Sequence, residues 1–163
     1  MRYINLGNTG LKVSRLCLGC MTYGATGNGS SSTGHAWTLE EDTSRPFFRA
    51  ALEAGINFFD TANSYTDSRS EVLTGKALKG RRHEAVVATK FYNPMGKGPN
   101  DSGMSRYHIM NAIEASLTRM DMDHVDIYYI HHVDQQTPLD EMLRALDDLV
   151  HQGKVRYIAC SNF

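Results

Sequence analysis

The chain has 163 residues, of which 41% are hydrophobic and 21% are charged, a composition typical of one globular domain with a buried core. Its formal net charge of -1 lacks the basic excess that binds nucleic acids or anionic membranes, so neither partner is expected. It contains no apolar run as long as a transmembrane helix and no apolar stretch of signal-peptide length at its start, which predicts a cytoplasmic protein.

The chain opens with a predicted β-hairpin over residues 3–14. Two short strand-like segments flank a glycine-rich turn at Gly7–Gly10. A buried strand is expected next, over residues 15–20. The glycines and serines of residues 24–37 then predict a loop.

Two of the three cysteines fall within this first strand. Cys17 and Cys20 have a CxxC spacing, but in a strand they point to opposite faces, which disfavours a redox or zinc role. Together with Cys160 they form an odd set in apolar surroundings. The sequence therefore predicts buried free thiols in a reducing compartment.

Beyond the loop, helices and strands alternate. Helical apolar spacing and terminal glycines predict four helices, over residues 40–54, 68–80, 105–121 and 137–153. Ser68 and Glu71 form a capping-box pattern at the second helix, and Thr137 followed by Pro138 predicts an N-cap with proline at the first helical position. Pro46 either lies in the first turn of a helix that starts late or kinks one that starts near residue 39.

Three apolar strands each end at an ionisable residue. These runs are Ile56–Asp60, Ala85–Lys90 and Val125–His131, and a last strand is expected over Val155–Cys160. Strands separated by helices predict a parallel sheet with right-handed crossovers.

Two α/β folds fit this pattern. A five-stranded doubly wound sheet is complete at about this length, whereas a (β/α)8 barrel needs about 250 residues, so the chain would be part of one. The segment from Gly19 to Gly24 does not have the GxGxxG spacing of a Rossmann cofactor site, which favours the barrel.

The ionisable residues at the strand ends predict an active site. The carboxyl ends of parallel strands meet at one rim of the sheet, so Asp60, Lys90 and His131 would lie together there, with Tyr65 five residues beyond Asp60. A phenol is a weak acid, with an unperturbed pKa of about 10. The Lys90 ammonium would stabilise its phenolate, and Asp60 would hold that ammonium in place.

His131 would hydrogen-bond the same substrate oxygen as Tyr65 and stabilise negative charge there. The four residues together therefore predict a proton donor for a carbonyl oxygen. Carbonyl reduction also needs a hydride, which no side chain supplies, so the chemistry implies a nicotinamide cofactor.

Each of these residues also has an ordinary structural interpretation. Asp60 alone would be a cap, Lys90 a solvated strand end and Tyr65 a surface residue, so the inference depends on all four together. His131 and His132 suggest a metal site, but neighbouring strand residues face opposite sides, so no metal is expected.

The motifs around these residues resemble the aldo-keto reductase superfamily over the whole chain. The resemblance is carried by the hairpin, by two strand-end segments and by the last strand with its extension, at Asn5–Ser14, Gly55–Ala62 with Tyr65, Val125–His131 and Gly153–Phe163. The segment Gly96–Arg106 is similar to the aryl-alcohol dehydrogenase-like and potassium-channel β-subunit-like members.

The resemblance implies a (β/α)8 barrel that reduces aldehydes or ketones with NADPH. It implies Tyr65 as the general acid, Lys90 and Asp60 as residues that tune it, and His131 as the group that orients the carbonyl. It also implies that Ser161 and Asn162 bind the nicotinamide carboxamide, that Met21 and Thr22 lie near the nicotinamide, and that Asp60 contributes to cofactor binding.

The family has eight βα units, whereas this chain ends after its fifth parallel strand. Residues 1–163 are therefore expected to form the N-terminal part of a single barrel domain. The open strand edges and uncovered apolar face would then favour self-association, or completion by a partner or by the remaining part of the barrel. Two alternatives stay open: a non-catalytic nicotinamide-binding module, and an inactive fragment.

Overall fold

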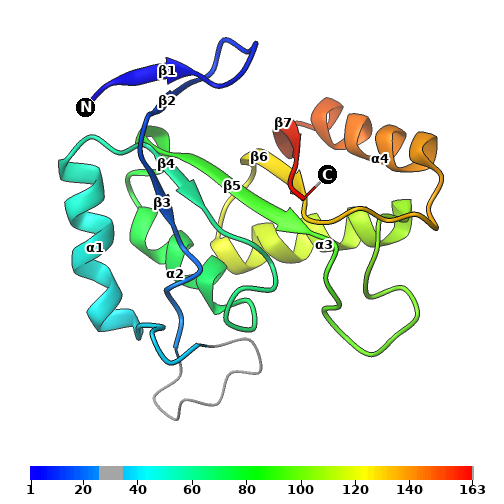
Figure 1. Ribbon diagram of the computed structural model, residues 1–163, viewed down its shortest axis with the longest axis horizontal. Coiled ribbons are helices and arrows are strands. Elements are labelled where there is room, and N and C mark those ends of the chain that lie inside the picture. The colour runs from blue at the N-terminus through cyan, green and yellow to red at the C-terminus, as the bar shows by residue number, and fades with distance from the viewer. Residues whose placement is uncertain (26–34, 163) are drawn as a thin grey trace.

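A computed structural model of the chain describes residues 1–25 and 35–162. The described part contains a β-hairpin, a five-stranded parallel sheet and four α-helices (Figure 1). The hairpin pairs β1 (Tyr3–Asn5) with β2 (Lys12–Ser14), as the sequence predicts. The sheet strands are β3 (Cys17–Gly19), β4 (Phe58–Asp60), β5 (Val86–Phe91), β6 (Val125–Ile130) and β7 (Val155–Cys160).

The sheet strands follow one another in space in the order of the sequence, β3-β4-β5-β6-β7. A doubly wound sheet would reverse its strand order at a switch point. The sequential order is that of part of a barrel, so the partial-barrel prediction is confirmed and the doubly wound alternative is wrong.

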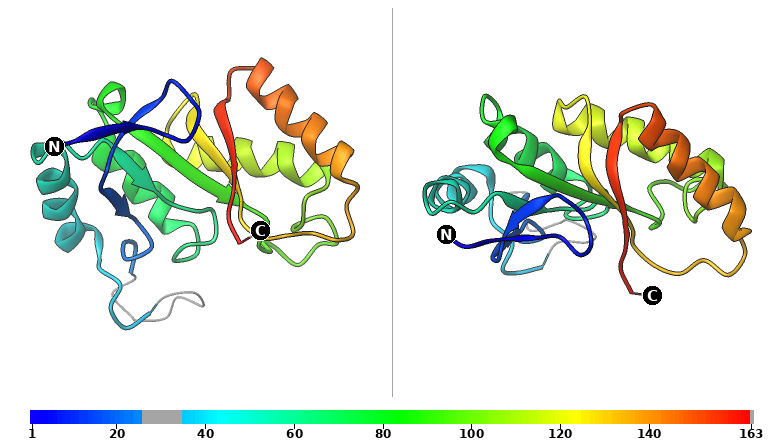
Figure 2. Two further views of the ribbon diagram at one scale, coloured as in Figure 1. Left: turned by 45° about the horizontal axis from the view of Figure 1, so that its top comes forward. Right: turned by 90° about the horizontal axis from the view of Figure 1, so that it is seen from above.

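The helices follow the strands as parallel crossovers require. They are α1 (Glu41–Glu53), α2 (Arg69–Leu78), α3 (Arg106–Met120) and α4 (Leu139–His151), with a short 3-10 helix at Arg82–Glu84. Figures 1 and 2 show α2, α3 and α4 packed on one side of the curved sheet. None of the helices in the described ranges is both long and apolar enough to cross a membrane.

The helix-facing side of the sheet holds the larger apolar core. Its fully buried members come from both layers, for example Phe59, Ile109, Tyr128 and Leu146. The opposite side, which we call the open face, holds a smaller cluster of Val13, Val86, Ala88 and Ile127, with Phe58, Tyr129, Tyr157 and Ala159 partly buried against it.

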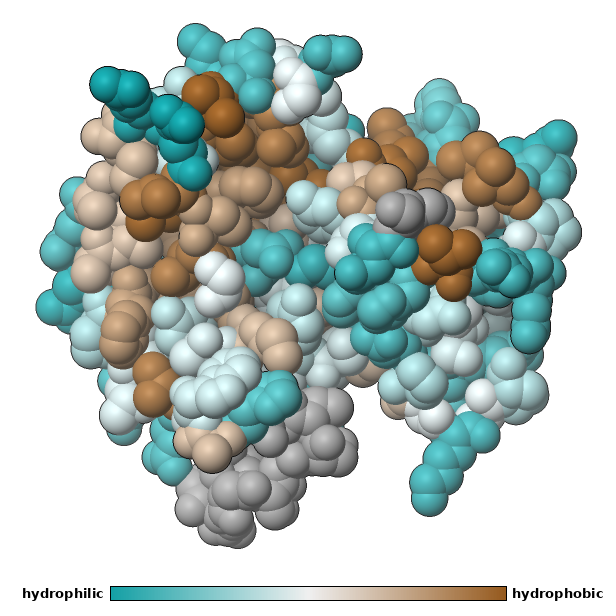
Figure 3. All heavy atoms as spheres, viewed as in Figure 1, coloured by the Kyte–Doolittle hydropathy of each residue, from teal (hydrophilic) through white to brown (hydrophobic). Residues whose placement is uncertain are grey.

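The open face leaves apolar groups in contact with solvent. Figure 3 shows apolar side chains gathered on this side of the molecule, around the hairpin and the neighbouring strands. Near the hairpin, Leu16 and Ile4 are 60% and 49% exposed. Within the described residues, β3 and β7 each pair with a strand on one side only, so the sheet has two open edges.

Two local predictions are wrong, because the side chains that were expected to cap helices have other partners or positions. Ser68 precedes α2 in the left-handed region at φ 71°, and Glu71 points into the core instead of capping the helix. The N-cap of α4 is Pro138, since the Thr137 hydroxyl donates instead to Asp134 at 2.8 Å. Of the two alternatives for Pro46, the structure agrees with the early start, since helix α1 begins at Glu41 with Pro46 inside it.

The cysteine prediction is wrong in part. Cys20 is buried, but Cys17 and Cys160 are exposed because they lie on the edge strands β3 and β7. Strand β3 is also shorter than expected and is not buried. Of the loop expected over residues 24–37, residues 26–34 lie outside the described part of the chain.

Candidate active site

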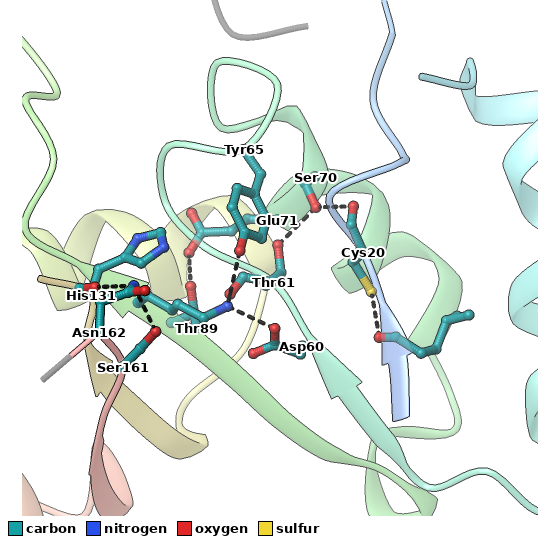
Figure 4. A network of polar contacts seen from close by, with 12 residues as sticks. Cys20, Asp60, Thr61, Tyr65, Ser70, Glu71, Thr89, His131, Ser161 and Asn162 are labelled. Carbon is teal, nitrogen blue, oxygen red and sulfur yellow. Dashed lines mark hydrogen bonds and ion pairs between the residues drawn. The ribbon is translucent and has the colours of Figure 1, made fainter. Parts of the chain in front are cut away.

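The structure brings Asp60, Tyr65, Lys90 and His131 together at the rim where the parallel strands end (Figure 4). Asp60 is the last residue of β4, Lys90 lies one residue before the end of β5, and His131 directly follows β6. Asp60 pairs with Ala88 in the register of β4 and β5. Lys90, two residues further along β5, therefore points to the same face as Asp60.

The Lys90 ammonium is held by three acceptors. Its Nζ donates to Asp60 Oδ2 at 2.7 Å, to the Thr61 carbonyl at 2.9 Å and to Tyr65 Oη at 3.3 Å. An ammonium has three hydrogens, so these contacts satisfy it completely. Lys90 is only 5% exposed, so Asp60 supplies the negative charge that its burial requires.

Aromatic rings also surround this ammonium. Lys90 Nζ lies 4.9 Å from the centre of the Tyr65 ring and 5.6 Å from that of the Tyr129 ring. Both distances fall within the range of cation–π attraction. Tyr129, which the sequence reading did not single out, therefore forms part of the surroundings of the cation.

The loop that carries Tyr65 has an unusual backbone. Thr66, Asp67 and Ser68 all have positive φ, at 47°, 53° and 71°. The turn is held by the Thr66 hydroxyl, which donates to the Tyr23 carbonyl at 2.7 Å, and by the Ser68 hydroxyl, which donates to the Asn63 carbonyl at 2.7 Å. Backbone strain of this kind is often found at functional sites, and here it accompanies the placement of the phenol beside Lys90.

His131 is held by its backbone at both sides. Its N–H donates to the Phe91 carbonyl at 3.0 Å, and its carbonyl accepts from Asn162 Nδ2 at 2.9 Å. Its ring lies edge-on to the Tyr65 ring, with centres 5.9 Å apart. Burial, and then the charges of Lys90 and His132, lower the pKa of His131 to about 4, so the ring is neutral near pH 7.

Ser161 and Asn162 lie beside His131 at the end of β7. Asn162 Nδ2 donates to Ser161 Oγ at 2.9 Å as well as to the His131 carbonyl, and the Ser161 N–H donates to the Ile130 carbonyl at 2.9 Å. A hydroxyl and a carboxamide can together donate to and accept from an amide. Their chemistry therefore fits the carboxamide of a nicotinamide.

Met21 and Thr22 follow the end of β3. The Thr22 carbonyl accepts from the Leu39 N–H at 2.7 Å, and Met21 is 37% exposed. Within residues 1–25 and 35–162, no hydrogen bond links either of them to the four residues around Lys90.

Sequence reasoning missed Asn93. Its Nδ2 donates to Ser64 Oγ at 3.0 Å and lies 3.4 Å from His131 Nδ1. Asn93 follows the end of β5 by two residues, so the strand-end rule that selected Lys90 is the signal that points to it.

The paired histidines do not face opposite sides of the sheet, contrary to the expectation from strand alternation. His131 and His132 lie beyond the end of β6, where strand alternation stops, and their rings stack with centres 4.7 Å apart. The described residues contain no cluster of three or more histidine, cysteine, aspartate or glutamate side chains that could hold a metal ion.

Comparison with known proteins gives one consistent family. A family model described as "Aldo/keto reductase family" matches residues 15–163. The uncharacterized oxidoreductase YrpG of Bacillus subtilis is 44% identical over 174 residues, covering 100% of this chain and 50% of that protein. A probable voltage-gated potassium channel subunit beta of rice, Oryza sativa subsp. japonica, is 37% identical over 167 residues, covering 100% of this chain and 47% of that protein.

A solved structure shows the same fold. The aldo-keto reductase AKR11C1 from Bacillus halodurans, in its holo form, superposes with a TM-score of 0.83 at 33% identity and covers 100% of this chain. The match covers 51% of that structure's chain. This chain thus spans about half the length of the relatives it matches.

Proposed function

Because the chain belongs to the aldo/keto reductase family, we propose that it carries the proton-transfer site of an oxidoreductase that reduces aldehydes or ketones to alcohols with NADPH. The observation that supports this proposal is the contact between a phenol and a buried ammonium: Tyr65 Oη lies 3.3 Å from Lys90 Nζ. That ammonium is in turn paired with Asp60 at 2.7 Å.

In the proposed reaction, Tyr65 gives its hydroxyl proton to the carbonyl oxygen. The bound nicotinamide supplies the hydride that the carbonyl carbon accepts. The phenolate left on Tyr65 lies against the Lys90 ammonium, which stabilises the new negative charge. Asp60 keeps that ammonium fixed, so little reorganisation is needed as the charge develops.

Neutral His131 would donate a second hydrogen bond to the same oxygen. A neutral donor stabilises the developing charge without competing with Tyr65 as the acid. Ser161 and Asn162 would hold the nicotinamide carboxamide, and Met21 and Thr22 would border the nicotinamide at the end of β3.

Replacement of the phenol tests the proposal in the complete protein. Tyr65→Phe is expected to lower the rate of NADPH oxidation with a panel of aldehydes by about 10²–10⁴-fold, since it removes the general acid. NADPH affinity, measured by fluorescence titration, is expected to stay near that of the wild type. Tyr107→Phe, at a tyrosine that is 64% exposed on α3, is the matched control. Full activity in Tyr65→Phe would remove this residue from the reaction.

A second candidate function is a nicotinamide-binding module without catalysis. It is favoured by the 37% identity to a protein named as a probable potassium channel subunit. Tight NADPH binding by the wild-type protein, together with no turnover on any aldehyde or ketone in the panel, would support this function over the first.

A further inference from the structure

We infer that Asn93 is a positioning residue that fixes the proton of His131 on Nε2 and so makes this nitrogen the donor toward the ligand. The inference rests on the proposed function, because it concerns the group that would orient the carbonyl. It adds a residue to the site and a defined tautomer to its histidine.

The hydrogen-bond chemistry of an amide supports this assignment. Asn93 Nδ2 lies 3.4 Å from His131 Nδ1 and 3.0 Å from Ser64 Oγ. An amide nitrogen only donates, and its two hydrogens match these two partners. His131 Nδ1 therefore accepts, and a neutral imidazole that accepts at Nδ1 carries its proton on Nε2.

The surroundings of His131 keep the ring neutral, which the tautomer argument requires. The titratable groups around it are Lys90, His132 and Tyr65, and none is a carboxylate in contact with the ring. Burial, Lys90 and His132 all lower the pKa of His131. A carboxylate at the position of Asn93 would do the opposite, because it accepts from Nδ1–H and favours the charged ring.

The tautomer decides what the ring offers to a carbonyl oxygen. With its proton on Nε2, the ring donates to the oxygen that Tyr65 protonates. With its proton on Nδ1, Nε2 would turn a lone pair toward that oxygen and repel it. Asn93 would thus act through His131, without touching the substrate.

The backbone before Asn93 is held in a conformation that places its side chain. Tyr92 has φ 141°, a region that side-chain-bearing residues rarely adopt, and its carbonyl accepts from the Gly103 N–H at 2.9 Å. The Tyr92 ring packs edge-on against His132, with ring centres 5.4 Å apart. This strain and these contacts fix where the chain leaves β5.

The substitution Asn93→Asp provides a sharp test, because it keeps the shape and replaces the donor by an acceptor. Its effect is read by NMR of the full chain with ¹⁵N-labelled histidine, which reports the protonation of each ring nitrogen. The chain has seven histidines, so the spectrum of His131→Gln assigns the signal. Asn93→Ala removes the donor without adding charge. Asn100→Asp adds the same charge on the same loop, at an exposed residue.

We expect the wild type and Asn100→Asp to carry the proton on Nε2, and Asn93→Asp to carry it on Nδ1 with a pKa for His131 raised from about 4. Asn93→Ala is expected to populate both tautomers. A wild-type ring protonated on Nδ1, or an Nε2–H tautomer that persists in both Asn93 variants, overturns the inference.

Kinetics of the complete protein separate this inference from the proposed function. In Asn93→Asp, kcat for aldehyde reduction is expected to fall about 100-fold, the usual effect of losing one donor to a developing oxyanion, while the Kd for NADPH is unchanged. An active enzyme without the tautomer switch overturns the inference alone. The expected switch in a protein without reductase activity overturns the proposed function alone.

Discussion

Two neighbouring residues of β5, Thr89 and Lys90, point to opposite faces of the sheet, and each contacts a member of an ion pair on its own face. On the helix-facing side, Glu71 Oε2 lies 2.6 Å from Arg119 Nε, and Glu71 Oε1 accepts from the Thr89 hydroxyl at 2.6 Å. On the open face, Lys90 Nζ lies 2.7 Å from Asp60 Oδ2.

The two pairs differ in their access to solvent. The Glu71 side chain is 0% exposed, whereas that of Asp60 is 29% exposed. The Glu71 carboxylate is fully buried where α2, α3 and β5 meet, so the role of this pair is to hold the layers together. The Asp60 carboxylate is partly accessible, and its partner Lys90 also contacts the Tyr65 phenol. Similar chemistry therefore serves structure on one face and, as we propose, catalysis on the other.

Removal of one charge from each ion pair is expected to give the largest difference in the free energy of unfolding between the two faces. Glu71→Gln is expected to lower the free energy of unfolding by about 3 kcal/mol, because it leaves Arg119 without its buried partner. Asp60→Asn should cost about 1 kcal/mol, because an amide oxygen can still accept from the buried Lys90 ammonium, which also keeps the Thr61 and Tyr65 oxygens as acceptors. Urea titration followed by circular dichroism measures both, with Glu114→Gln, a 55% exposed partner of Lys154, as the control. Equal losses for Glu71→Gln and Asp60→Asn would show that both pairs are structural.

Two glycine substitutions compare how closely the two faces of the sheet are packed. A Cβ on Gly75 would lie 2.1 Å from the Met120 backbone carbonyl, where α2 packs against the end of α3, whereas a Cβ on Gly19 of the open face meets nothing within 4 Å. Gly75→Ala is expected to cost about 2 kcal/mol by overpacking. Gly19→Ala should leave the melting temperature near that of the wild type. Thermal unfolding by calorimetry compares them, and a stable Gly75→Ala variant would contradict the close packing of the helix side.

The pH dependence of stability gives the smallest expected effect. The pKa of His131 is lowered to about 4 in the folded chain, below its usual value of 6.5. The unfolded chain therefore binds the proton first, so stability falls as the pH drops from about 6.5 to about 4. Relative to His131→Gln, the wild type should lose on the order of 1 kcal/mol over this window, since a single group binds its proton more weakly in the folded chain. Urea midpoints measured from pH 7 to pH 4 test this, and parallel curves for the two proteins would contradict it.

Most of the fold could be predicted from the sequence, because strand ends and helix periodicity are local signals. The alternation of strands and helices placed Asp60, Lys90 and His131 at one rim, and the partial barrel is confirmed by the strand order. The side-chain network was harder to predict. Glu71 matches a capping box locally, but it is paired in space with Arg119, 48 residues away.

Asn93 illustrates the same difficulty within the site. Its contact with His131 spans 38 residues and depends on the backbone at Tyr92, which has φ 141°. No periodicity or composition signals such a turn. Asn93 therefore had only its position near a strand end to mark it, whereas Tyr65, which also lies on an irregular loop, was found because it is close in sequence to Asp60.

The complete satisfaction of the Lys90 ammonium has a consequence for the aldehyde reduction that we propose. A free amine condenses with an aldehyde to form an imine, which would inactivate such a site. All three hydrogens of Lys90 are bound, to Asp60, Thr61 and Tyr65, and the charged nitrogen keeps no lone pair for attack. The arrangement that makes this lysine useful to its neighbours thus also protects it from covalent modification by the compounds it would help to reduce.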